Sequence, residues 1–110
     1  MKWYKDLYMD DKFRDKTERI KWKIEHNVLS PFTYLITLPS NEQNLMDIIP
    51  AADLLQRAYP KRELFIIGIE RGYTQAAMMA ASIVLEVYTK TGAFDVTQYI
   101  LQQEEAHKKE

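Results

Sequence analysis

The stretch from Glu63 to Tyr88, ELFIIGIERGYTQAAMMAASIVLEVY, decides the fold class of this chain. Its first part, residues 64–69, is a short apolar run rich in β-branched residues, which is typical of a strand. A turn with Gly72 follows, and then an alanine- and methionine-rich segment that is too long for a strand and predicts a helix over 73–90. A strand, a turn and a helix in succession indicate an α/β domain.

A second strand is predicted over 33–38, where alternation places Tyr34, Ile36 and Leu38 on one side. The strand over 64–69 is apolar without interruption except at Gly68, and this pattern is typical of a parallel sheet with both faces covered.

The segment between these strands contains a predicted helix over 50–58, which begins at Pro50 and is stopped by Pro60. A connection of this length that contains a helix suits a right-handed βαβ crossover. We therefore expect the two strands to pair in parallel.

Two further helices complete the predicted fold, an amphipathic one over 12–26 and a final one over 96–105, which Asp95 caps. Gly92 is expected to end the helix before it. The aromatic segment 1–10 fits either a helical turn or a strand, because its apolar residues satisfy both spacings. The prediction is a single α/β domain over 1–110, with element order α-β-α-β-α-α, helices packed on a small sheet, and a frayed tail over 106–110.

The composition excludes several classes of function. The net charge of −1 gives no overall attraction to nucleic acid or to an anionic membrane. Zero cysteines exclude disulfides, thiolate zinc sites and cysteine nucleophiles. The longest mostly apolar stretch, 76–88, contains Glu86 and is shorter than the about 20 residues that span a bilayer. No signal peptide is visible, so we expect a cytoplasmic protein without a membrane partner.

The turn after the second strand is the first candidate site. A helix N-terminus presents free backbone N–H groups that bind phosphate or carboxylate. The candidate ligand-binding residues are Gly68, Arg71, Gly72, Tyr73 and Thr74. The spacing matches neither of the glycine-rich nucleotide motifs, and Glu70 places a negative charge where an anion would lie. The alternative is that Gly72 supplies a turn conformation and Thr74 caps the helix.

The helix over 73–90 is the second candidate, because it is apolar over most of its circumference and must be covered on more than one side. A second copy of the chain could provide that cover, and so could the first and last helices within one chain. The candidate interface residues are Met78, Met79, Ile83 and Val87.

Catalytic and metal-binding residue types are sparse, so the sequence predicts no catalytic residue, metal site or cofactor. His26 and His107 have no second ligand at metal-like spacing, and Ser30, Ser40 and Ser82 lie in no nucleophile motif. The basic residues over 12–23 are interleaved with carboxylates, which makes nucleic acid an unlikely partner.

The chain resembles a family of small uncharacterised bacterial proteins of about 100 residues. The resemblance lies in Met1–Tyr4, Leu45–Pro50, Gly68 with Gly72 and Tyr73, and Glu86–Tyr88 through Gly92–Val96. These stretches contain no chemical motif, so the resemblance implies a shared fold and carries no activity.

Three hypotheses follow. The first is a non-enzymatic interaction or accessory module that forms a homodimer through the alanine- and methionine-rich helix. The second is a small-ligand or nucleotide binder that uses the helix N-terminus at Gly72–Thr74, and the third is a nucleic-acid accessory protein.

Overall fold

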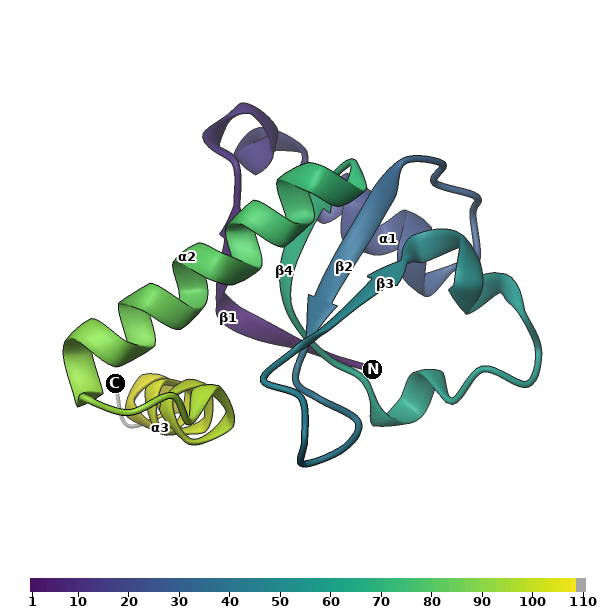
Figure 1. Cartoon of the computed structure of the whole chain (residues 1–110). Helices are drawn as coiled ribbons and strands as arrows, with labels where there is room; N and C mark the ends of the chain where they lie inside the picture. The colour runs from purple at the N-terminus through teal and green to yellow at the C-terminus, as the bar shows by residue number, and fades with distance from the viewer. Residues whose placement is uncertain (109–110) are drawn as a thin grey trace.

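Four strands form one mixed sheet in the computed structural model, which describes residues 1–108 (Figure 1). In chain order the strands and α-helices are β1 (Lys2–Met9), α1 (Thr17–Glu25), β2 (Thr33–Thr37), β3 (Asp47–Pro50), β4 (Phe65–Arg71), α2 (Tyr73–Thr91) and α3 (Val96–Lys108). Short 3₁₀ segments lie at Asp11–Lys16, Ala51–Leu55 and Lys61–Glu63. The α/β class is confirmed, but the observed order of strands and α-helices is β-α-β-β-β-α-α.

The strands lie side by side in the order β1-β4-β2-β3. The segment 1–10, whose sequence fitted either a helical turn or a strand, contains strand β1. This strand pairs in parallel with β4, from Lys2 opposite Phe65 to Met9 opposite Ile69. Pairing is irregular between Trp3 and Tyr8, so the middle of this edge strand leaves the regular ladder.

The prediction that the strands over 33–38 and 64–69 pair in parallel is wrong, because β2 and β4 are antiparallel. The reason is β3, a strand of four residues that forms an antiparallel pair with β2. Since β2 is antiparallel to both neighbours, β3 and β4 run in the same direction. The crossover therefore joins β3 to β4, and its helical part is the 3₁₀ segment Ala51–Leu55 instead of a helix over 50–58. Pro50 ends β3, an edge strand that tolerates proline.

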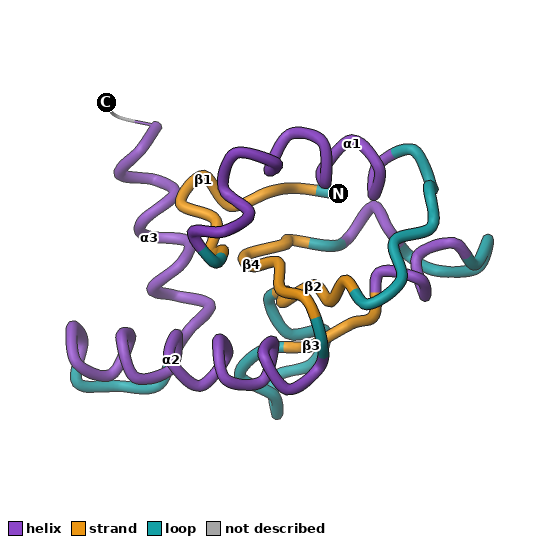
Figure 2. The backbone as a smooth tube through the Cα atoms, turned by 90° about the horizontal axis from the view of Figure 1, so that it is seen from above, coloured by secondary structure: helices purple, strands orange, loops and turns teal. Residues whose placement is uncertain are grey.

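The sheet separates two apolar clusters, with α1 on one side and α2 on the other (Figure 2). The buried residues on the α2 and α3 side are Tyr4, Ile36, Ile67, Ile83, Val87, Val96, Tyr99 and Ile100. Those on the α1 side are Leu7, Met9, Ile24, Leu35, Ala51, Leu54, Ile66 and Ile69. Leu35 and Ile36 of β2 point into different clusters, as do Ile66 and Ile67 of β4, which explains why β4 is apolar without alternation.

The helix ends follow the local sequence signals. Gly92 has a φ of 74° and its N–H donates to the carbonyl of Tyr88 at 2.8 Å, so it ends α2 as expected. Asp95 accepts a hydrogen bond from the N–H of Gln98 at 3.0 Å and caps α3. Residues 106–108 of the predicted frayed tail are helical and belong to α3, and its last two residues lie outside the described part of the chain. The predicted helix over 12–26 is a 3₁₀ segment followed by α1.

Gly68 lets α2 lie close to the sheet. A Cβ at this position would lie 3.2 Å from Sδ of Met79, which is a tight contact, and 3.4 Å from Cβ of Ile36, where ordinary van der Waals contact begins. The absence of a side chain on β4 therefore sets the distance between the sheet and α2.

We predict that Gly68→Val lowers the free energy of unfolding by about 1–3 kcal/mol, because three added carbons overfill this contact. Gly68→Ala should cost less, since the flexible Met79 side chain can shift. Urea denaturation of both variants measures the effect. An unchanged midpoint for Gly68→Val would show that α2 is not seated on Gly68.

Candidate functional site

The turn between β4 and α2 does not bring the five predicted ligand-binding residues together. Gly68 is buried within β4 beside Met79, away from the surface of the turn. Gly72 has a φ of 87°, and its N–H already donates to the carbonyl of Phe32 at 2.7 Å. Its role as a turn residue is therefore confirmed.

The start of α2 also offers little to an anion. The buried carboxylate of Glu70 accepts a hydrogen bond from the N–H of Arg71 at 2.8 Å, which keeps a negative charge beside the helix N-terminus. The exposed ring of Tyr73 packs edge-to-face against Tyr34 with centroids 5.8 Å apart. No side chain caps the helix, so the expected cap from Thr74 is absent.

Two of the four predicted interface residues lie in the core. Ile83 and Val87 are 0% exposed and face the sheet and α3, so they have no surface to offer a partner. Met79 is half-buried against the same cluster. Of the four, Met78 is exposed, with 61% of its surface accessible. The prediction of an interface therefore needs different residues.

Those residues form a row on α2 opposite its buried side. Met78, Ala81, Leu85 and Tyr88 follow one another at spacings of three and four residues and are all exposed. Leu85 is the most exposed of them at 65%. The ring of Tyr88 stacks on that of the exposed Phe94, with centroids 4.8 Å apart. We call Met78, Ala81, Leu85 and Tyr88 the outer stripe.

A groove of about 730 Å³ runs along the outer edge of β1, between the α1 region and α2. Its charged lining residues are Lys5, Asp6, Arg14, Glu18, Lys21 and Glu86. Three cations and three carboxylates balance, so the groove has no net charge that would favour one sign of ligand.

A hydrogen-bonded cluster at this groove joins three elements. The hydroxyls of Tyr8 on β1 and Tyr99 on α3 both donate to Oε2 of Glu86 on α2, the second at 3.1 Å. The pKa of Tyr8 is raised above its ordinary value, mainly by burial and secondly by the hydrogen bond to Glu86. Burial, followed by the charge of Asp6, raises the pKa of Tyr4. The phenols of Tyr4 and Tyr8 stay protonated, and that of Tyr8 donates its hydrogen bond to Glu86, which favours a structural role for the cluster over acid–base chemistry.

The last helix, α3, also supplies a hydrogen-bond acceptor to the backbone in the irregular part of β1. Glu104 is 3% exposed, and its carboxylate accepts a hydrogen bond from the backbone N–H of Lys5 at 2.6 Å. Nε2 of His107 lies 2.5 Å from a carboxylate oxygen of Asp6. No local pattern in the sequence indicates these contacts, because they join residues about a hundred positions apart.

The remaining candidates are not assembled into a reactive site. His26 stacks on Trp22 with ring centroids 4.3 Å apart, and His107 pairs with Asp6 on the other side of β1. Within residues 1–108, no three histidine or carboxylate side chains gather as a metal-ligand set. The same residues contain no helix long and apolar enough to cross a membrane.

Comparisons with protein-family models, with curated proteins and with solved structures found no match. The resemblance to small bacterial proteins therefore stays a prediction.

We predict that Tyr8→Phe lowers the free energy of unfolding by about 1–3 kcal/mol, because it removes a donor to a charged acceptor. Tyr73→Phe is the matched control, since the Tyr73 side chain is exposed, and it should change stability by less than about 0.5 kcal/mol. Chemical denaturation at neutral pH measures both. Equal effects of the two variants would contradict a role for the Glu86 cluster in stability.

The raised tyrosine pKa values also predict loss of stability in alkali. The pKa of Tyr8 is higher in the folded chain than its unfolded value of about 10, so the folded state holds the proton more tightly. The contribution that this pKa difference makes to folding stability is complete below about pH 10 and is lost as the pH rises above that value. Urea midpoints measured from neutral to alkaline pH should fall in this window, and less steeply for Tyr8→Phe. Identical profiles for the two proteins would contradict the assignment.

Proposed function

We propose that this protein is a non-enzymatic interaction module that forms a homodimer through the outer stripe of α2. One observation supports the proposal most directly. The stripe places Met78, Leu85 and Tyr88 in solvent along a single helix face, with 61%, 65% and 48% of their surfaces accessible. Contiguous exposed apolar side chains of this kind are typical of protein interaction sites.

A second copy of the chain is the partner that suits the stripe best. In a two-fold symmetric pair, the same surface of both copies forms the contact. A charged residue in that surface would therefore lie close to like charges on the other copy. The outer stripe contains no charged residue. Ala81 lies near its middle, between Met78 and Leu85, and its small side chain allows two helices to approach closely. An antiparallel pair crossing at Ala81 would place Met78 of one copy against Leu85 of the other.

The surroundings of the stripe also suit an interface. Its neighbours Thr74, Ser82 and Thr89 are exposed and uncharged, and they would form a polar rim. A dimer interface of standard size buries about 800 Å² per partner. That is roughly a tenth of the 7336 Å² accessible surface of this chain. The outer stripe with Phe94 supplies an apolar centre for such a contact.

We do not propose a ligand site at Gly72–Thr74, because the carboxylate of Glu70 would repel an anion there and Gly68 packs in the core. A cytoplasmic location stays part of the proposal. The absence of cysteine from the sequence supports it.

We predict that the wild-type protein has twice its single-chain mass of 13.0 kDa in solution, and that Leu85→Glu has the single-chain mass. The variant would place a carboxylate against Met78 of the other copy and remove apolar contact, which should weaken association at least about tenfold. Size-exclusion chromatography with light scattering at tens of micromolar measures the mass.

Leu55→Glu is the matched control, because Leu55 is 39% exposed and lies in the 3₁₀ segment after β3. It should stay dimeric. A monomeric wild-type protein in this concentration range would refute the proposal. Equal dissociation of both variants would place the interface away from the outer stripe.

A further inference from the structure

A second exposed apolar surface lies where the chain passes from α1 to β2. Its members project from the end of α1 and from the loop that follows. They are Trp22, Val28, Leu29 and Phe32, with 55%, 40%, 57% and 68% of their surfaces accessible. We call these four residues the loop patch. None of them belongs to the groove at β1 or to the outer stripe.

The loop that carries the patch is held in a defined shape at both ends. Asn27 and Phe32 have φ values of 58° and 71°, in the left-handed region. Nζ of Lys61 donates to Oδ1 of Asn27 at 2.5 Å, and the N–H of Gly72 donates to the carbonyl of Phe32 at 2.7 Å. These contacts come from distant parts of the chain, so the loop is fixed by the fold.

Phe32 is the unusual residue in this loop. Asparagine tolerates the left-handed region, but a bulky side chain rarely adopts it, because its Cβ approaches the following carbonyl oxygen. Here the strained backbone does not bury the ring, since Phe32 is 68% exposed. The conformation belongs to a turn that the N–H of Thr33 closes by donating to the carbonyl of Ser30 at 3.3 Å, and this turn leaves the ring of Phe32 exposed.

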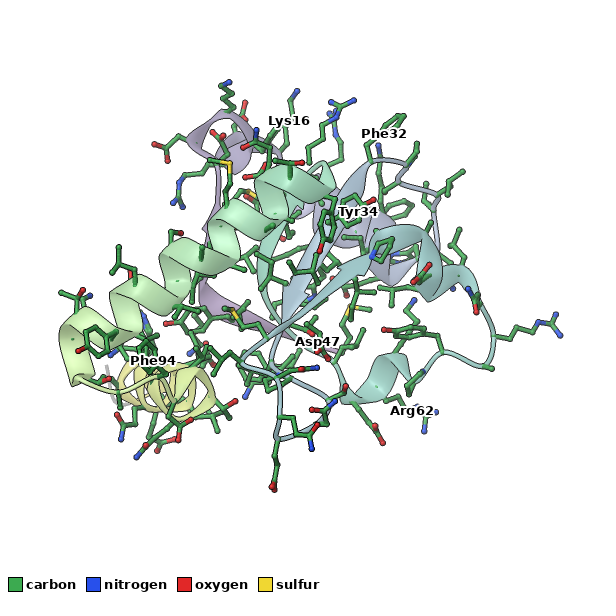
Figure 3. All side chains as sticks on the ribbon, in the orientation of Figure 1. Lys16, Phe32, Tyr34, Asp47, Arg62 and Phe94 are labelled. Atoms are coloured by element: carbon green, nitrogen blue, oxygen red, sulfur yellow. The ribbon has the colours of Figure 1, made fainter. Side chains whose placement is uncertain are left out.

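A row of cations lies along one side of the α1 region. Lys16, Arg19 and Lys23 are exposed and follow one another at i, i+3 and i+7, although the exposed carboxylates Asp15, Glu18 and Glu25 belong to the same segment. Lys16 and Arg71 line a cavity of about 180 Å³ together with Pro31 of the loop. Figure 3 shows Lys16 and Phe32 pointing outward at the same end of the molecule. The carboxylate at this cavity, Glu70, is buried and bonded to the N–H of Arg71.

The overall charge conceals this asymmetry. From Asp11, where the 3₁₀ segment begins, to Phe32 the chain contains six Lys or Arg against four Asp or Glu, a local net charge of +2 in a chain whose net charge is −1. Exposed aromatic and aliphatic side chains among cations are the features of a surface that binds the interface of an anionic bilayer.

We propose that the loop patch docks this protein on membranes that contain anionic lipids. Leu29 and Phe32 enter the interfacial region, and Lys16, Arg19, Lys23 and Arg71 contact lipid phosphates. The observations favour a lipid surface over a nucleic acid, because Val28 and Leu29 have no ring on which a base could stack. This inference revises the expectation of no membrane partner, which rested on the net charge of the whole chain, and it is independent of the proposed dimer.

The test uses the full chain and flotation with two kinds of vesicle, phosphatidylcholine alone and phosphatidylcholine mixed with phosphatidylserine. The protein should float with the mixed vesicles and not with the neutral ones, and added salt should weaken binding. Leu29→Ser should weaken it about tenfold, because an inserted leucine is lost. Lys23→Glu should weaken it at least about fivefold.

Phe32→Gly separates binding from folding. Glycine adopts the left-handed region freely, so this variant should have an unchanged or higher Tm while its vesicle binding falls about tenfold. Leu101→Ser is the control, because Leu101 is 47% exposed on α3, away from the loop patch. It should bind like the wild-type protein.

Failure of the wild-type protein to bind the mixed vesicles would overturn the proposal. Wild-type binding by Phe32→Gly, or equal loss in Leu101→Ser, would also overturn it. Tighter binding to single-stranded polyuridylate than to the mixed vesicles at the same salt would assign the patch to nucleic acid instead.

Discussion

The burial of β4 on both faces is the constraint on which the rest of the structure depends. Ile66, Ile67 and Ile69 are at most 3% exposed, although they point to different sides of the sheet. Such a strand needs a neighbouring strand on each edge and a cover on each face. β1 and β2 supply the edges, while α1 and α2 supply the covers (Figure 2). The short distance between α2 and the sheet depends on Gly68, which has no side chain at the centre of β4.

The last helix completes the cover that α2 needs. Tyr99 and Ile100 of α3 pack in the same cluster as Ile83 and Val87 of α2. Glu104 then bonds to the irregular middle of β1, so the first and last elements of the chain hold each other. Because α3 covers one flank of α2 and the sheet covers another, the apolar surface left in solvent is reduced to the outer stripe.

The two exposed apolar surfaces lie on different elements of the fold. The outer stripe lies on α2, and the loop patch lies on α1 and on the loop that follows it. A dimer formed through α2 would leave both loop patches uncovered. Two weak membrane contacts on one particle bind more tightly than either alone, provided that both reach the same surface. The two proposals are therefore compatible, although each rests on its own residues.

The sequence by itself determined the elements whose signals are local. The strand from Phe65, the helix that Gly92 ends and the start of the last helix at Asp95 all match the structure, because caps and glycine conformations act within one turn of chain. The side of β2 that carries Tyr34 and Ile36 was also predicted, since alternation is fixed by the strand itself.

Only the tertiary structure decided which strands pair and which side of α2 faces solvent. The four residues of β3 carry too weak a pattern to be recognised, and their pairing with β2 reverses the expected direction of β4. A helix that is apolar all round gives no periodic signal for its buried side. Ile83 and Leu85 are equally apolar, yet one is 0% and the other 65% exposed, because the positions of the sheet and α3 decide between them. The strained Phe32 likewise depends on a hydrogen bond from Gly72, which is distant in sequence.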